Sequence, residues 1–141
     1  MSKIGLISQD LVDKLKTVTE FQSRVGLAVG GTEIDPMNRD LPRPASWPVF
    51  TGIQIVDSSA PAPENVSVQY TYVVKILTDY DTEANLISVH LPLLEKTIET
   101  VKGTNINGLG FHSWSYNGMS MESLDADRMV FVLNFSVLSG L

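Results

Sequence analysis

The chain has 141 residues, 43% of them apolar, which suits one domain with a substantial core. Ten Lys and Arg stand against sixteen Asp and Glu, giving a formal charge of −6, so the clustered cations that grip a phosphate backbone are scarce. The absence of cysteine excludes disulfides, thiol catalysis and thiolate metal sites. The chain start lacks the apolar run of a signal peptide, and no segment approaches the roughly 20 apolar residues of a membrane span. We therefore expect a soluble protein made inside the cell, with no membrane partner.

The first predicted element is an amphipathic helix. Its start is open between an N-cap at Ser8 and an earlier start near Ser2. Asp10 and Lys14 are expected on its solvent side. Its inner face is predicted from apolar residues at helical spacing: Ile4, Ile7, Leu11, Val12, Leu15 and Val18. A short strand is predicted next, over residues 24–29.

A long loop is predicted over residues 32–48, because it is rich in proline: Pro36, Pro42, Pro44 and Pro48. Prolines make such a loop stiff and extended. Loops of this length inside a compact domain tend to be functional or disordered. Leu41 and Trp47 are apolar, and Arg39 and Arg43 are the only cations that share a loop. We expect this loop to contact a neighbouring subunit through Leu41 and Trp47.

Two strands are predicted after the loop, over residues 49–56 and 66–76. The second shows the clearest alternation of apolar and polar residues in the chain, which predicts one buried face and a mostly polar face of an antiparallel sheet.

A second helix is predicted over residues 82–102, with Asp81 or Thr82 as its cap. Pro92 lies inside it and lacks the amide N–H that a helix interior uses. We therefore expect a kink or a split around residues 89–91.

The last part is predicted as a hairpin with strands over residues 109–117 and 129–138. The connection over residues 118–127 is too long for a tight turn, and it carries four candidate contact residues: Met119, Met121, Asp125 and Asp127. Strands therefore follow one another instead of alternating with helices. This order predicts a single α+β domain over residues 1–141, with a mainly antiparallel sheet of about five strands flanked by two main helices.

The side chains that usually carry catalysis or metal binding do not form a known motif. The acidic run over residues 79–83 lacks the glycine and glutamate that a calcium loop needs at its sixth and twelfth positions. His90 and His112 have no partner at metal-ligand spacing, and Ser113 points to the opposite strand face from His112. We expect no catalytic residue, no cofactor and no metal, and structural roles for both histidines.

The order of elements resembles the tail terminator (tail completion) proteins of tailed bacteriophages and phage-derived contractile particles. An amphipathic N-terminal helix and a proline-rich stretch lead into three segments that carry the resemblance: PVFTGIQI at 48–55, YTYVVKI at 70–76 and DRMVFVLNFSV at 127–137.

The resemblance implies a small sheet flanked by helices, assembled as a hexameric ring that caps the tail tube. It implies three partners besides the chain itself: the tail tube protein, a neck or head–tail connector protein, and DNA that passes through the lumen without specific binding. It also implies location in the virion tail or neck after synthesis in the host cytoplasm, and no catalysis. The sparse cations suit a lumen that does not grip phosphates.

Two alternatives remain open at this point. One is another neck or head–tail joining protein, and the other is a soluble small-molecule-binding α+β domain. The latter would need a concave pocket with convergent polar groups. Under the ring interpretation, the candidate contacts are Arg39, Leu41, Arg43, Trp47, Met119, Met121, Asp125 and Asp127.

Overall fold

Apolar and polar residues alternate along strand β2 (Ser67–Asp79), and this places one row of side chains, from Val68 to Ile76, on a fully buried face. In the computed structural model, β2 pairs on one side with β1 (Ala45–Asp57) and on the other with β4 (Arg128–Gly140), both antiparallel. β3 (Trp114–Ser123) completes a four-stranded antiparallel sheet in the order β1-β2-β4-β3. The structure describes residues 2–21, 25, 44–57, 67–79, 82–109, 112–123 and 128–140.

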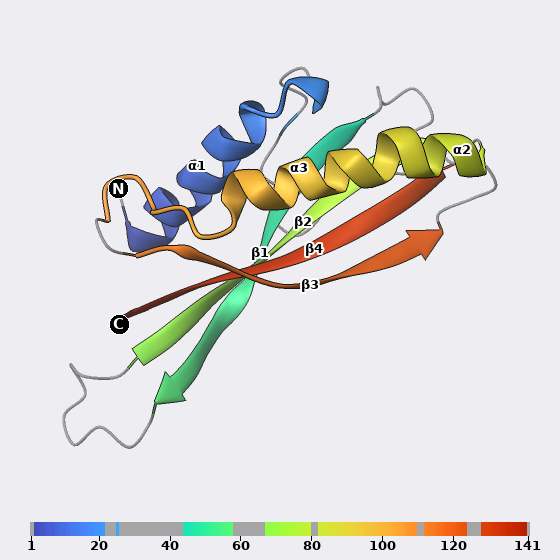
Figure 1. Cartoon of the computed structure of the whole chain (residues 1–141). Coiled ribbons are helices and arrows are strands. Elements are labelled where there is room, and N and C mark those ends of the chain that lie inside the picture. Colours follow the sequence, from blue (N-terminus) through green and yellow to red (C-terminus); the bar gives the residue numbers. More distant parts are fainter. Residues whose placement is uncertain are drawn as a thin grey trace.

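Two long helical segments lie on the same face of the sheet (Figure 1). The first is α1 (Lys3–Lys16), followed by a short 3-10 turn, η1 (Thr19–Phe21). The second runs continuously through α2 (Glu83–Asn85), the π-helix η3 (Leu86–His90) and α3 (Leu91–Val101). Both segments pack apolar side chains in one core against the facing rows of β2, β3 and β4. β1 adds the half-buried Phe50 to this core. The predicted single α+β domain is thus confirmed in its class.

The caps and the break in the second helix follow from local sequence. Ser2 is the N-cap of α1, and its hydroxyl accepts a hydrogen bond from the amide of Gly5 at 3.0 Å, so the earlier of the two predicted starts is correct. Thr82 caps α2 in the same way. The π-turn immediately precedes Pro92, where a regular helix would need an N–H that proline lacks. The predicted irregularity around residues 89–91 is confirmed.

The sheet differs from prediction in its strand count. Four strands are described instead of five, because the predicted strand over 24–29 lies outside the described residues apart from Val25, which forms one parallel bridge with Ser46. β3 begins at Trp114 and continues to Ser123, so the predicted loop over 118–127 was wrong for its first half. Met119 and Met121 alternate with Ser120 and Glu122, which is a strand pattern, and Gly118 takes up a register shift with φ +121°.

The opposite face of the sheet carries a second, smaller apolar cluster: Trp47, Leu77, Val130 and Val132, with Val49 and Val73 partly buried beside it. β1 begins at Ala45, so the predicted loop ends earlier than Pro48. A proline is compatible with this position because β1 is an edge strand, whose outer side needs no N–H for the sheet.

Candidate interaction surfaces

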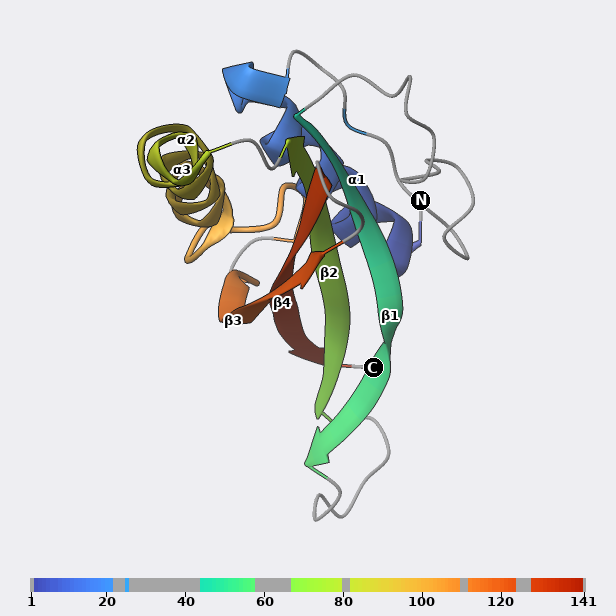
Figure 2. The same cartoon turned by 90° about the vertical axis from the view of Figure 1, so that its right-hand side faces the viewer.

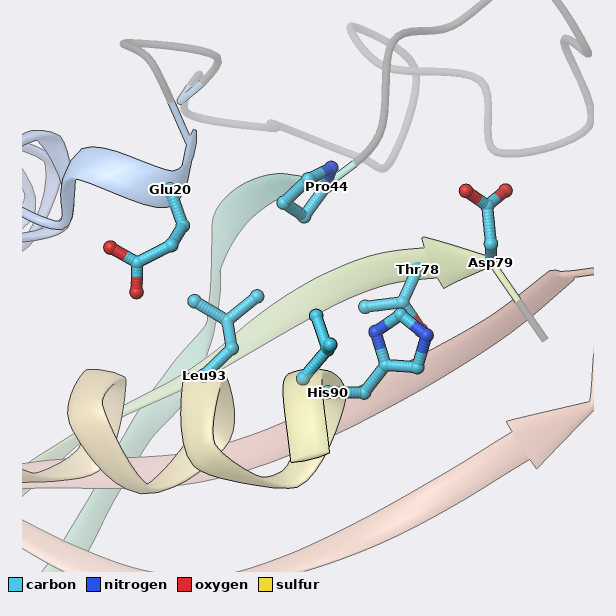
Figure 3. Close-up of a pocket in the computed structure, with 7 residues that line it drawn as sticks. Glu20, Pro44, Thr78, Asp79, His90 and Leu93 are labelled. Atoms are coloured by element: carbon cyan, nitrogen blue, oxygen red, sulfur yellow. The ribbon is translucent and has the colours of Figure 1, made fainter. Parts of the chain in front are cut away.

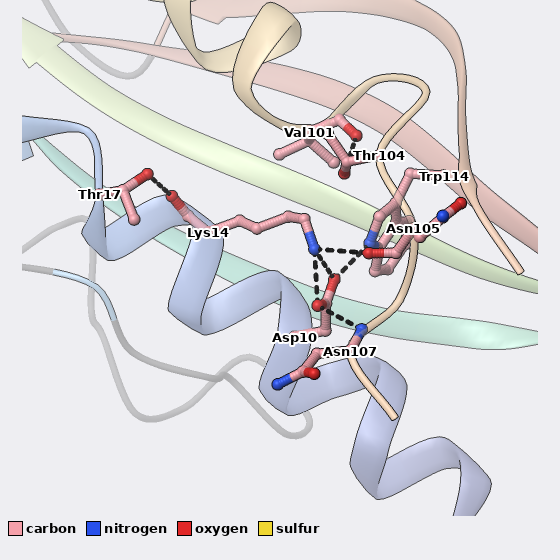
Figure 4. A network of polar contacts seen from close by, with 8 residues as sticks. All are labelled: Asp10, Lys14, Thr17, Val101, Thr104, Asn105, Asn107 and Trp114. Carbon is pink, nitrogen blue, oxygen red and sulfur yellow. Dashed lines mark hydrogen bonds and ion pairs between the residues drawn. The ribbon is translucent and has the colours of Figure 1, made fainter. Parts of the chain in front are cut away.

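A buried carboxylate joins α1 to the segment that leads into β3 (Figure 4). Asp10 is only 4% exposed, and both of its oxygens accept hydrogen bonds from Lys14 Nζ at 2.6 Å. The backbone N–H of Asn107 donates to Oδ1 at 2.9 Å, and Trp114 Nε1–H donates to Oδ2 at 2.8 Å. The expectation that Asp10 faces solvent was therefore wrong: it is enclosed by loop 104–109, which donates the N–H of Asn107, and by Trp114 at the start of β3. This network sets where β3 starts relative to α1.

A pocket of about 290 Å³ opens between the helical segment and the end of β2 (Figure 3). It is lined by Glu20, Pro44, Thr78, Asp79, Val89, His90 and Leu93. The Thr78 hydroxyl is buried and has no hydrogen-bond partner among the described residues. Polar residues from three elements therefore line one small concave site.

Glu20, one of the residues that line the pocket, forms an ion pair with Lys96. Lys96 Nζ donates to Glu20 Oε1 at 2.7 Å, and Thr19 donates to the same oxygen at 2.8 Å. These hydrogen bonds, that of Lys96 foremost, lower the pKa of the Glu20 carboxyl below its usual 4.5. Glu20 is therefore ionised at neutral pH.

The two histidines lie apart from each other. His90 lines the pocket at the end of the π-turn, and the Nδ1–H of His112 donates to the carbonyl of Leu109 at 2.7 Å within its own loop. Among the described residues, no group of three or more His, Asp or Glu side chains is placed to hold a metal ion. In the same part of the chain, no helix has the length and apolar character needed to cross a membrane.

Of the eight large apolar side chains that are exposed among the described residues, seven lie in two parts of the molecule, and the eighth is Leu138 on β4. One is the second half of β1, with Ile53 and the 66% exposed Ile55. The other combines the first half of the second helical segment with β3: Ile87, Val89, Leu91, Met119 and Met121. These two places lie at opposite ends of the molecule in Figure 1, where the β1 arrow and α2 are far apart.

The candidate contact residues divide into three groups. Met119 and Met121 are exposed, as a contact surface requires. Trp47 is only 2% exposed, so its expected role as a subunit contact was wrong: it lies inside β1 and packs in the second apolar cluster. The remaining candidates lie outside the described residues: Arg39, Leu41, Arg43, Asp125 and Asp127.

Sequence reasoning missed the isoleucines at both ends of the molecule. Ile53 and Ile55 belong to a predicted strand, and the strand pattern does not predict that they are exposed. The helical pattern likewise does not predict that Ile87 is exposed. Their local patterns are those of core positions. For Ile53 and Ile55, the signal that could have found them is the length of α1 relative to that of β1.

Comparison with known proteins gives a fold likeness only. No protein-family model and no curated protein matches the sequence. Among solved structures, the fold is similar to a chain in the virion of a native gene transfer agent (GTA) particle, with a TM-score of 0.65 and 12% sequence identity. The match covers 98% of this chain and 97% of that chain, so the two share one architecture from end to end.

Proposed function

We propose that this chain is a structural protein of a phage-like virion and, within it, the tail terminator that closes the finished tail tube and joins it to the neck or head. The observation that carries the proposal is the likeness to a gene transfer agent virion chain over 98% of this chain and 97% of the other. A match that leaves almost nothing unpaired on either side favours a shared type of building block over a shared small motif. The resemblance noted in the sequence points to the same class of protein.

The proposed role needs a surface for assembly and requires no catalytic residue. Apolar side chains exposed at both ends of the molecule support it, because a domain that acts alone rarely leaves several large apolar side chains together in water. The number of subunits, six, is taken from the resemblance. The tail tube protein, a neck or head–tail connector protein and passing DNA are the proposed partners.

The test is a tube-growth assay. The tube protein of the same particle is polymerised with and without the purified chain, and tube lengths are measured by electron microscopy. The proposal predicts that tubes stop growing and carry a ring of added density at one end. Tubes that grow equally long, with bare ends, would contradict the tail terminator role.

The pocket supports a second candidate function, binding of a small molecule. Its volume of about 290 Å³ is near the lower limit for ligand sites, and the buried Thr78 hydroxyl gives it one polar anchor. Val89→Trp should fill the pocket mouth, while Ile87→Trp, on the same helical segment and outside the lining, is the matched control. A compound from a fragment screen that raises the melting temperature of the wild type and of the control, but not of Val89→Trp, would favour this candidate.

A further inference from the structure

Asparagine is followed by glycine at two places in the chain, residues 107–108 and 117–118. In this dipeptide the backbone nitrogen of the glycine can attack the asparagine amide more readily than in other contexts, because glycine has no side chain to hinder the approach and its backbone rotates freely. In a folded protein the reaction also depends on how firmly each pair is held. The structure holds these two pairs very differently.

The pair at 107–108 lies in an exposed turn of loop 104–109. This loop lies between α3 and β3 in the chain and reaches α1 (Figure 2), where the N–H of Asn107 donates to Asp10 Oδ1 at 2.9 Å. The N–H of Leu109 donates to the carbonyl of Ile106 at 3.2 Å and closes the turn around Gly108, whose φ is +89°. One hydrogen bond on either side of the pair therefore holds this turn.

Neither reacting group of this pair is engaged. Among the described residues, the side-chain amide of Asn107 and the backbone nitrogen of Gly108 have no hydrogen-bond partner. In Figure 4 the dashed line at Asn107 ends on its backbone nitrogen, and none reaches its side-chain amide. The turn is also loosely surrounded, because a Cβ placed on Gly108 would find its nearest described neighbour, Leu6 Cδ2, at 3.6 Å. The amide and the nitrogen are thus free to approach each other.

The pair at 117–118 is held inside the sheet. Asn117 Nδ2 donates to Ser136 Oγ at 2.8 Å, and the carbonyl of Gly118 accepts from Asn134 Nδ2 at 3.2 Å. Both residues belong to β3, which pairs with β4 before and after them. The strand must open locally before the nitrogen of Gly118 can reach the side chain of Asn117, and this opening has a free-energy cost that a surface turn does not have.

We propose that Asn107 is a site of spontaneous deamidation, with water as the only co-reactant, and that the sheet protects Asn117. The backbone nitrogen of Gly108 bonds to Cγ of Asn107, the Cγ–Nδ2 bond breaks, and the amide nitrogen leaves as ammonia with the proton of the Gly108 N–H. Water then opens the cyclic imide. Its attack at Cγ gives an aspartate, whereas its attack at the backbone carbonyl carbon gives an isoaspartate, whose main chain runs through the side-chain carbons.

Either product alters the contact that joins loop 104–109 to α1. Each adds a carboxylate to the residue whose N–H donates to Asp10, so two like charges are brought into the same region. The isoaspartate also inserts one carbon into the main chain between that N–H and the N–H of Leu109 that closes the turn. We therefore expect the isoaspartate to loosen the Asp10 network more than the aspartate does. This inference concerns the folded chain itself and does not depend on the virion role.

The test is peptide mapping by mass spectrometry after the full chain has been incubated in mildly alkaline heavy-oxygen water. Each conversion by this route takes one oxygen atom from the solvent, so the label marks residues modified during the incubation. We expect Asn107 to convert about tenfold faster than Asn117, which corresponds to about 1.4 kcal/mol. In urea that unfolds the chain, the two pairs should convert at similar rates. Equal rates in the folded protein, or a faster reaction at Asn117, would overturn the proposal.

Asn107→Gln is the matched variant. Its longer side chain must close a larger and slower-forming ring, and its backbone N–H can still donate to Asp10. We expect the label to disappear from residue 107 and to remain unchanged at Asn117. Labelling of the glutamine at the rate of the wild-type asparagine would indicate direct hydrolysis of the amide and would contradict attack by the Gly108 nitrogen.

The structural consequence is measured by urea unfolding of the separated isoaspartate form. Freshly prepared Asn107→Asp is its control, because it carries the new charge on an unaltered main chain. We expect the urea midpoint to fall from the wild type to Asn107→Asp and further to the isoaspartate form. Equal midpoints for the two modified forms would contradict the effect of the lengthened main chain, and an isoaspartate form as stable as the wild type would contradict any effect on the Asp10 network.

Discussion

Replacing Asp10 should destabilise the fold more than any other substitution of a charged side chain on α1. The carboxylate accepts a hydrogen bond from the buried Nε1–H of Trp114 at 2.8 Å and another from the partly buried N–H of Asn107 at 2.9 Å. A buried donor that loses its acceptor costs about 1–3 kcal/mol. Lys14 is partly exposed and can turn to water, so its loss adds little. The orphaned Trp114 donor therefore predicts a loss of about 1–3 kcal/mol for Asp10→Ala, and the Asn107 N–H adds less because water can reach it.

The assay is urea unfolding followed by circular dichroism at neutral pH. Asp13→Ala is the matched control, because Asp13 is on the same helix, is exposed and bonds only Gln9 among the described residues; its expected effect is within about 0.5 kcal/mol. The loss of stability for Asp10→Asn should lie between those for Asp10→Ala and Asp13→Ala. The amide oxygen of Asn still accepts one hydrogen bond, but its NH₂ group faces the other donor and cannot accept from it.

A double-mutant cycle with Trp114→Phe isolates the indole contact. Removing both partners leaves no orphaned donor at that oxygen, so the two effects should be less than additive by about 1 kcal/mol. If the stability of Asp10→Ala lay within about 1 kcal/mol of the wild type, water would have to satisfy the donors, and the assignment of this network as a buried lock between α1 and β3 would be refuted.

Three further predictions concern other parts of the fold. Trp47→Ala should lower the free energy of unfolding of the monomer by about 3–5 kcal/mol in a urea titration, because Trp47 is buried in the second apolar cluster. An unchanged free energy of unfolding would contradict the burial of Trp47 and favour its role as a surface contact. The lowered pKa of Glu20 means that its pair with Lys96 adds stability above pH 4.5 that is lost as the pH falls through the lowered value. Glu20→Gln should therefore cost about 0.2–1 kcal/mol at pH 7 and flatten the acid side of a stability–pH profile, whereas an unchanged profile would rule out this contribution. Gly118→Ala should cost about 1–3 kcal/mol by thermal unfolding, because φ is +121° there, whereas Ser120→Ala on the same strand should be close to neutral.

The parts of the fold that depend on neighbouring residues could be predicted from the sequence. The alternation along β2 identified its buried row, and Thr82 and Pro92 located a cap and an irregular turn, because each of these effects acts within one or two turns of chain. The start of α1 at Ser2 instead of Ser8 was left open because both serines fit the local capping pattern.

The misassigned residues depend on contacts that are distant in sequence. Asp10 has the spacing of a solvent-facing helix residue, and its burial follows from Trp114, 104 positions away. Trp47 was assigned to a loop because prolines surround it, but an edge strand tolerates Pro48. In both cases the deciding partner is supplied by the tertiary fold, so periodicity within one segment could not identify it.

The exposed isoleucines reveal a limit of pattern analysis that simple lengths can correct. Ile53 and Ile55 alternate with polar residues in the way that Val68 and Tyr70 do, so a strand pattern assigns all four to a buried face. The pattern is accurate about which face they occupy, but burial also needs a covering element. A strand of 13 residues is about twice as long as a helix of 14, because each residue advances a strand by about 3.3 Å and a helix by about 1.5 Å. Wherever an apolar row outruns the helices that the chain can place on it, the surplus is exposed in the monomer, and a second subunit is one source of the missing cover.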